Sequence, residues 1–185
     1  MKALRMEVLL AFSGMLLAVQ GCPHIVSRSE WSQRASLCSK TLPPSRKYAV
    51  IHHTLGKRCF SMVTCKKQLQ NIQHYHMVTR KWCDIGYNFL IGEDGNIYEG
   101  RGWTKQGAHT YGYNWNSLGI SIMGNFMRDA PNKLALTAAQ NLIQCLASKG
   151  YLASNYVLKG HRQLGKTKCP GDSLYNIITK WPNWS

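Results

Sequence analysis

Cys169 is the residue that most clearly indicates chemistry, because it makes the number of cysteines odd: the chain has seven. Where cysteines pair as disulfides, an odd one remains for an intermolecular bridge, a free thiol or a metal ligand. The other six lie upstream, at or before position 145. Cys169 follows His161 by eight residues and precedes Pro170-Gly171, which turn the backbone and can direct the thiolate back toward that histidine.

A catalytic zinc ion usually takes three protein ligands and leaves one position for water, so a third ligand is required. The candidates are His52 and His53, which end a β-branched, apolar segment typical of a buried strand. Side chains alternate between the two faces of a strand, so only one histidine of the pair can join the metal. A lone histidine is more often a core or surface residue. The spacing alone therefore leaves zinc binding and a purely structural role both open.

Hydrophobic periodicity indicates the elements that would position these residues. A strand is expected at 47 to 53, and a helix follows the N-cap Ser61 and runs to about Arg80. The remaining pattern predicts two short strands around a Gly-Glu-Asp-Gly turn at 85 to 100. It also predicts strands at 118 to 124 and 156 to 160 and helices at 133 to 149 and 173 to 181. Strands separated by helices predict an α/β fold with a mixed sheet covered by helices.

The first 21 residues have the composition of a secretory signal peptide. Lys2 and Arg5 precede an apolar run from Val8 to Val19, which is too short to span a bilayer. A bacterial lipoprotein site at Cys22 is the alternative, and the residue before Gly-Cys, a glutamine, disfavours it. We therefore expect a secreted chain whose residues 22–185 form a single domain, with no transmembrane segment.

The chain is strongly basic, with a formal net charge of +15, of which +14 falls after the predicted signal segment. Such a charge favours anionic surroundings, among them bacterial wall polymers, anionic membranes and glycans. No nucleic-acid-binding motif is present, and secretion makes nucleic acid the weakest of these partners. A solubilising surface explains the charge equally well. The sequence does not indicate an oligomeric state.

A family resemblance rests on long motifs that occur in order along the chain. These are IHHT, HYHM, WCDIGYNFLIGEDGNIYEGRGW, GAHTYGYN, SLGISIMGN, GHR and KCPG, and the similarity spans about residues 22 to 184. They resemble the short peptidoglycan recognition proteins of innate immunity, whose domain is related to the phage-type zinc amidases. The resemblance implies a mixed central sheet, three main helices and a groove that binds the muramyl peptide of bacterial walls.

The resemblance also distinguishes members that cleave the wall from members that only bind it. Cleaving members carry the first histidine of the pair and the cysteine, whereas binding members have lost one or more ligands. By resemblance, His52, His161 and Cys169 hold zinc, Tyr87 is the catalytic tyrosine and Thr167 is a polar residue beside the metal. The bond that would break joins the lactyl carbonyl of N-acetylmuramic acid to L-alanine.

Further roles are implied only by the resemblance. Six cysteines allow fifteen pairings, and the family implies Cys22 with Cys145, Cys38 with Cys83 and Cys59 with Cys65. The implied groove residues are His53, His76, Arg80, Trp82, His109, Tyr111 and Asn114. Arg101 suits the extra carboxylate of a diaminopimelic stem peptide, because an arginine forms bidentate hydrogen bonds with carboxylates. Lys81, however, departs from the family's patterns for both types of peptide.

Three functions therefore compete. The first is a secreted zinc N-acetylmuramoyl-L-alanine amidase, which the complete ligand set and Tyr87 favour. The second is a recognition protein that binds peptidoglycan without cutting it. The third is a cationic bactericidal protein that acts on bacterial envelopes, as the net charge suggests.

Overall fold

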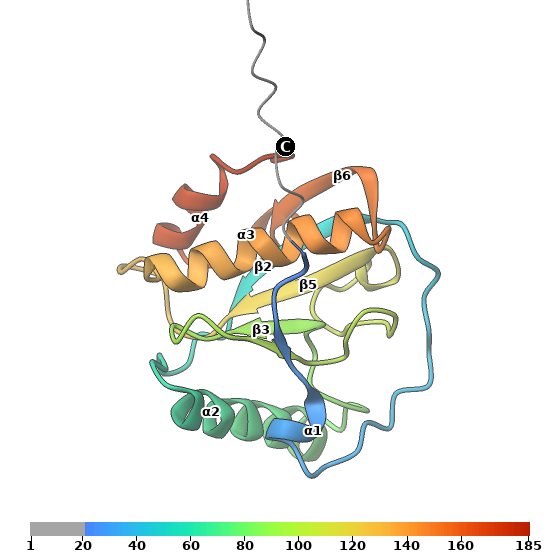
Figure 1. Cartoon of the computed structure of the whole chain (residues 1–185), viewed down its shortest axis with the longest axis vertical. Helices are drawn as coiled ribbons and strands as arrows, with labels where there is room; N and C mark the ends of the chain where they lie inside the picture. Colours follow the sequence, from blue (N-terminus) through green and yellow to red (C-terminus); the bar gives the residue numbers. More distant parts are fainter. Residues whose placement is uncertain (1–20) are drawn as a thin grey trace, which may run out of the picture.

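In the computed structural model of the protein, which describes residues 21–185, six strands form one mixed sheet (Figure 1). The strand order is β1-β4-β3-β5-β2-β6. Strand β2, next to the edge strand β6, is parallel to both of its neighbours, β5 and β6, whereas β3 and β4 form an antiparallel hairpin. The strands are β1 Ile25–Val26, β2 Arg46–His53, β3 Phe89–Ile91, β4 Ile97–Glu99, β5 Ser117–Ile122 and β6 Leu152–Gly160.

Helices connect and cover these strands. Two of them begin at side-chain N-caps: Ser61 accepts a hydrogen bond from the backbone of Thr64, and Asn132 accepts one from the backbone of Ala135. The α-helices are α1 Arg28–Trp31, α2 Met62–His74, α3 Lys133–Ser148 and α4 Asp172–Ile178. A π-helical turn, η1 Tyr75–Thr79, extends α2, and two 3₁₀ turns are η2 Asn114–Asn116 and η3 His161–Gln163.

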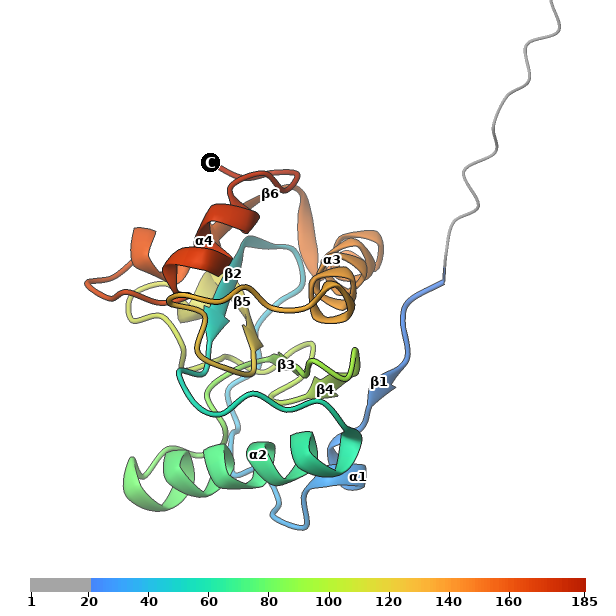
Figure 2. The ribbon, with the colours of Figure 1, turned by 90° about the vertical axis from the view of Figure 1, so that its left-hand side faces the viewer.

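The two faces of the sheet are covered by different helices (Figure 2). On one face, Ile51 of β2 belongs to the same buried cluster as Leu142 of α3 and Leu174 of α4. On the other face, Leu69 of α2 packs in a second buried cluster with Leu90 of β3. Both faces therefore contribute to buried apolar clusters, as expected for a sheet with helices on each side.

The predicted α/β fold with a mixed sheet and three main helices is confirmed. The sequence pattern missed β1 and α1, and it predicted only the last part of β6, which begins at Leu152. The last helix ends at Ile178, three residues before the predicted end at Trp181. The predicted signal segment, residues 1–21, lies outside the described residues apart from Gly21. No helix within the described range is long and apolar enough to cross a membrane.

Three disulfides cross-link the described chain. They link Cys22 with Cys145, Cys38 with Cys83, and Cys59 with Cys65. These are the pairs that the family resemblance implied, and Cys169 is the cysteine that they leave free. The first bridge closes a loop across 123 residues of sequence and fastens the start of the domain to α3. Bridges across long loops constrain the unfolded chain most strongly.

Candidate metal centre

Three side chains of types that can bind a metal ion converge where the parallel strands β2 and β6 end. His52 comes from the end of β2, His161 directly follows β6, and Cys169 lies in the loop between η3 and α4. One ligand atom from each of the three residues lies within 4.8 Å of the other two. Ligand sites in open α/β sheets commonly lie beyond the carboxyl ends of the strands. The fold thus brings His52 beside a cysteine that is 117 positions away in sequence.

The loop that carries Cys169 is held on both sides of the thiol. The backbone N–H of Arg162 donates to the carbonyl of Cys169 at 2.9 Å, and the Thr167 hydroxyl accepts from the Cys169 N–H at 3.1 Å. The thiol itself accepts from the backbone N–H of His53 at 3.4 Å. Gly171 then turns the chain with φ of 94°, against the backbone of Phe126. The thiol is therefore directed at β2 by the backbone, independently of any cation.

These donors suit a zinc ion, since two imidazole nitrogens and one sulfur are common ligands of zinc. Burial lowers the pKa of His52 well below its usual value, with the nearby His109 and His161 adding to the effect, and burial also lowers the pKa of His161. Both rings are consequently neutral at physiological pH, which is the state that binds metals. Burial raises the pKa of the Cys169 thiol to about 12. Deprotonation at neutral pH therefore needs a cation beside the sulfur.

The ring of His52 has a different neighbour on each side. Its Nδ1 lies 3.7 Å from the sulfur of Cys169, and its Nε2 lies 3.0 Å from Nδ1 of His109. Only 1% of His52 is exposed. Its orientation is therefore fixed by packing, with Nδ1 toward the cluster of ligands and Nε2 toward the protein interior.

Tyr87 and Thr167, the predicted catalytic residues, differ in how deeply they are buried. The ring of Tyr87 is 5.3 Å from the ring of His52. Burial, followed by the nearby Cys169, raises the pKa of Tyr87, so its hydroxyl keeps its proton and can donate a hydrogen bond. Thr167 is exposed, and its oxygen already accepts from the N–H of Cys169. Its hydroxyl proton remains available to a substrate.

A row of predicted groove residues continues from Tyr87 along the protein. The ring of His76 is 6.0 Å from Tyr87 and 4.6 Å from Trp82, and the guanidinium of Arg80 lies 5.4 Å from the centre of the Trp82 ring. The Nδ1 of His76 accepts from the backbone N–H of Gly86. Burial and nearby arginines lower the pKa of His76 to about 4, so this ring is neutral. A row of aromatic rings that ends at a cation suits a glycopeptide, which has both apolar and polar groups.

The remaining groove candidates are scattered around the centre. His53 is buried beside Phe126, and the backbone N–H of Phe126 donates to Nδ1 of His53. Burial lowers the pKa of His53 to about 4. Asn114 uses its side-chain oxygen to accept from the backbone N–H groups of His109 and Thr110. Tyr111 is 98% exposed and touches none of the metal-ligating residues. The structure thus joins His53, His109 and Asn114 to the centre and leaves Tyr111 at the surface.

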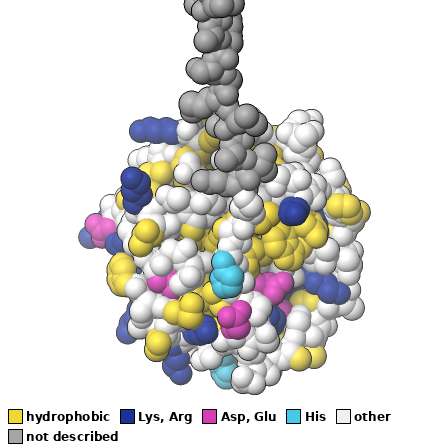
Figure 3. All heavy atoms as spheres, viewed as in Figure 1, with side chains coloured by type: hydrophobic (Ala, Val, Ile, Leu, Met, Phe, Trp, Pro, Cys, Tyr) yellow, Lys and Arg dark blue, Asp and Glu magenta, His cyan; other side chains and the backbone are white. Residues whose placement is uncertain are grey.

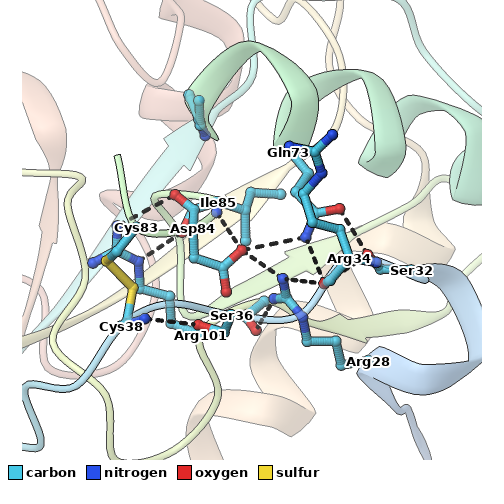
Figure 4. Close-up of polar contacts among 12 residues, drawn as sticks. Arg28, Ser32, Arg34, Ser36, Cys38, Gln73, Cys83, Asp84, Ile85 and Arg101 are labelled. Atoms are coloured by element: carbon cyan, nitrogen blue, oxygen red, sulfur yellow. Dashed lines mark hydrogen bonds and ion pairs between the residues drawn. A yellow bond between two sulfur atoms is a disulfide. The ribbon is translucent and has the colours of Figure 1, made fainter. Parts of the chain in front are cut away.

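Arg101 lies in a separate polar cluster (Figure 4). Its guanidinium donates to the carbonyls of Ile85, Gln106 and Asp84, at 2.7, 2.6 and 3.3 Å. The buried carboxylate of Asp84 accepts from Arg28 at 2.5 Å. Of the five N–H donors of Arg101, two therefore hold the turn before Tyr87, one holds the loop at Gln106, and the others remain for a ligand.

A cavity of about 300 Å³ lies elsewhere, between α3, β6 and the C-terminal residues. Its lining contains no histidine, cysteine, acidic or basic residue and no residue predicted for the site. It offers neither metal ligands nor charged groups. The residues that line it are Gln140, Ile143, Gln144, Ala147, Tyr156, Leu158, Trp181, Pro182 and Asn183.

Three buried hydroxyl side chains at the centre were not predicted from the sequence. Thr110 and Ser117 contact the ring of His109, and Ser121 pairs with His52 in the register of β5 and β2. The Ser121 hydroxyl is buried with no hydrogen-bond partner among the described residues. A polar residue at 121, between the apolar Ile120 and Ile122, was the signal that could have identified it.

Comparisons with known proteins agree with this geometry. The domain family described as N-acetylmuramoyl-L-alanine amidase matches residues 41–172. Peptidoglycan recognition protein 1 of Bos indicus is 52% identical over 179 residues, which cover 96% of this chain and 93% of that protein. The structure of bumblebee PGRP-SA matches with a TM-score of 0.87 and 44% identity, covering 89% of this chain and 98% of the other.

A further solved structure is that of human PGRP-IBETAC in complex with glycosamyl muramyl pentapeptide. It matches with a TM-score of 0.86 and 48% identity, covering 89% of this chain and 99% of the other. The described domain is thus of the amidase type in its fold. The chain belongs to the family of peptidoglycan recognition proteins.

Proposed function

We propose that this chain is a secreted, zinc-dependent N-acetylmuramoyl-L-alanine amidase that acts on bacterial peptidoglycan in antibacterial defence. The observation that carries the proposal is the convergence of His52, His161 and Cys169, with the thiol outside every disulfide. A cysteine kept free beside two neutral histidines in a domain with three disulfides is best explained by a metal. Relatives bound to muramyl peptides support the substrate class.

The proposed reaction is hydrolysis of the amide between N-acetylmuramic acid and L-alanine. Bound zinc would supply a Lewis acid and a water with a pKa near 7. Tyr87, which keeps its proton, would donate a hydrogen bond to the oxygen that becomes negative, and Thr167 would add a second donor from the surface. The row of His76, Trp82 and Arg80 would hold the glycopeptide beside them. No carboxylate belongs to the described cluster, so the chain offers no acidic general base there.

The test is a digest of soluble peptidoglycan by the purified protein, with and without a chelator. We expect free stem peptides, identified by mass spectrometry, to appear only in the digest without chelator and to return when zinc is added. The control is Cys169→Ser, which removes the sulfur ligand and leaves all three disulfides intact. We expect this variant to bind peptidoglycan and to release no peptide.

A recognition protein without catalysis would give a different result. Binding of peptidoglycan without release of peptide at any zinc concentration would overturn the amidase proposal and support recognition alone. Release of peptide that persists in chelator, or in the Cys169→Ser variant, would show that hydrolysis does not depend on the metal centre.

A further inference from the structure

We propose that His109 is a positioning residue that holds His52 in the tautomer able to bind metal. Neutral histidine carries its proton on one of two ring nitrogens, and only the bare nitrogen can bind a cation. The inference rests on the proposed zinc centre and adds a residue that would act through a ligand. It concerns the protein's own hydrogen bonds, which are present without the metal.

The hydrogen bonds start from a fixed backbone carbonyl. The Ser117 hydroxyl donates its single proton to the carbonyl of Tyr113 at 2.8 Å. The Ser117 oxygen also lies 3.5 Å from Nε2 of His109, and it can only accept there, because its proton is already used. His109 therefore carries its proton on Nε2. In a neutral ring with its one proton on Nε2, Nδ1 is bare.

The bare Nδ1 of His109 determines the proton on His52. This Nδ1 lies 3.0 Å from Nε2 of His52, and it has no proton to donate. An attractive contact requires that His52 donate from Nε2, since two bare nitrogens at this distance would repel. The proton of His52 is thus on Nε2, and its Nδ1, on the side of Cys169, is bare. The Thr110 hydroxyl lies between the two rings, 2.9 Å from Nδ1 of His109 and 3.5 Å from Nε2 of His52, so its oxygen can share the proton that His52 donates.

The ring of His109 packs closely against two glycines. A Cβ atom on Gly107 or on Gly119 would lie 2.4 Å from the nearest carbon of the ring. Asn114 fixes the backbone of the same residue by accepting from its N–H at 2.9 Å. His109 is 8% exposed, so it has little surface to offer a substrate. Its packing and its hydrogen bonds both direct it toward His52, as outer partners of metal-bound histidines commonly do.

The first experiment needs no variant. Two-bond proton–nitrogen correlation spectra of the metal-free, ¹⁵N-labelled protein at pH 7 report which nitrogen of each histidine carries the proton. We expect both His52 and His109 to be protonated on Nε2. A spectrum with His52 protonated on Nδ1 would overturn the inference, whatever the protein's activity.

The second experiment measures zinc affinity by competition with a chromogenic chelator. His109→Leu removes the acceptor, and we expect zinc affinity to fall about 10- to 100-fold. His109→Asn places a carbonyl oxygen where Nδ1 stands, so it should restore most of the affinity. The matched control is His74→Leu, the same change at an exposed histidine on α2. It should bind zinc like the unmodified protein.

The outcomes separate this inference from the proposed function. If the unmodified protein binds no zinc, the metal centre itself fails. If it binds zinc and both His109 variants bind equally well, only the positioning role fails. A third outcome is that zinc affinity falls in His109→Leu and is not restored in His109→Asn, while both metal-free variants lose thermal stability equally. This outcome would show that His109 only supports the fold. The tautomer spectrum decides the question even where a variant does not fold.

Discussion

At the scale of single residues, the roles proposed for Tyr87 and for the three proposed zinc ligands are separable. Tyr87 contacts the ring of His52 and supplies no ligand atom to the cluster. Its raised pKa makes it a hydrogen-bond donor throughout the physiological range. A change at Tyr87 should therefore alter the reaction without altering the binding of zinc.

Tyr87→Phe tests this separation, because it removes only the hydroxyl. We expect turnover of muramyl peptides to fall about 100- to 1000-fold, the usual effect of losing one donor to a developing oxyanion. Zinc affinity should be unchanged. Tyr111→Phe, at the exposed tyrosine, is the control and should retain full turnover. A fully active Tyr87→Phe enzyme would remove Tyr87 from the mechanism.

The choice between His52 and His53 shows how far single residues could be predicted. Strand alternation predicted that one of the pair would face the cluster, but it did not say which one. The structure decides this through tertiary contacts: His53 accepts from Phe126, and His52 lies beside Cys169. The contact between His52 and His109 joins residues 57 positions apart, and no local pattern marks it. Such contacts depend on how loops that are distant in sequence pack against β2, and no local sequence pattern reveals this packing.

At the scale of elements, the loop between η3 and α4 carries Cys169, the proposed sulfur ligand, and ends at a glycine. Gly171 has φ of 94°, and a Cβ there would lie 2.3 Å from the backbone of Phe126. Two separate constraints therefore require glycine, one from the backbone angle and one from the space available. The loop cannot accept a side chain at this position without moving Cys169.

Gly171→Ala should consequently lower both stability and zinc affinity. We expect the free energy of unfolding, from urea titration of the metal-free protein, to fall by about 1–3 kcal/mol. The matched control is Gly150→Ala, which has φ of 73° and open space around the added Cβ, so it carries only the backbone cost. A loss in Gly171→Ala no greater than that in Gly150→Ala would contradict the predicted collision.

The two long helices were predictable, and two short elements, β1 and α1, were not. Helices α2 and α3 each contain several turns of apolar spacing, and both begin at a serine or asparagine whose side chain caps the first turn. β1 has two residues and α1 has four, too few for any periodicity. β1 forms because Ile25 pairs with Ile97 of β4, and this partner is distant in sequence. Short elements of this kind exist only through tertiary pairing.

At the scale of the whole molecule, basic residues are spread over a surface with few acids. No aspartate or glutamate occurs between Glu30 and Asp84, a stretch that includes β2, α2 and the predicted site residues from His52 to Trp82. Lys and Arg side chains are scattered over the face seen in Figure 3 rather than gathered in one patch. A diffuse positive potential of this kind speeds the approach to anionic wall polymers and weakens as salt rises.

Buried histidines make the metal-free fold sensitive to acid. His76 has a pKa of about 4 in the folded state and 6.5 as an ordinary histidine, so the unfolded chain binds the proton first as pH falls. The neutral His76 ring therefore costs no stability above pH 6.5, and the free energy of unfolding falls as the pH drops from 6.5 to about 4. For this residue the loss is roughly 3 kcal/mol.

Urea unfolding in chelator at several pH values checks this expectation. The free energy of unfolding should fall from pH 6.5 to about 4. His76→Asn should reduce the slope, because the amide does not titrate and can still accept from Gly86. A curve with the same slope in both proteins would show that His76 does not contribute to acid sensitivity.

The free thiol of Cys169 also affects how the chain reaches its native state. Oxidative folding must pair six particular sulfurs and leave the seventh reduced. A thiolate attacks disulfides readily, so an unprotected seventh sulfur can scramble bridges that have already formed. A cation held by Cys169 and the two imidazoles early in folding would mask that sulfur. The ion proposed for catalysis would then also act as a protecting group during maturation.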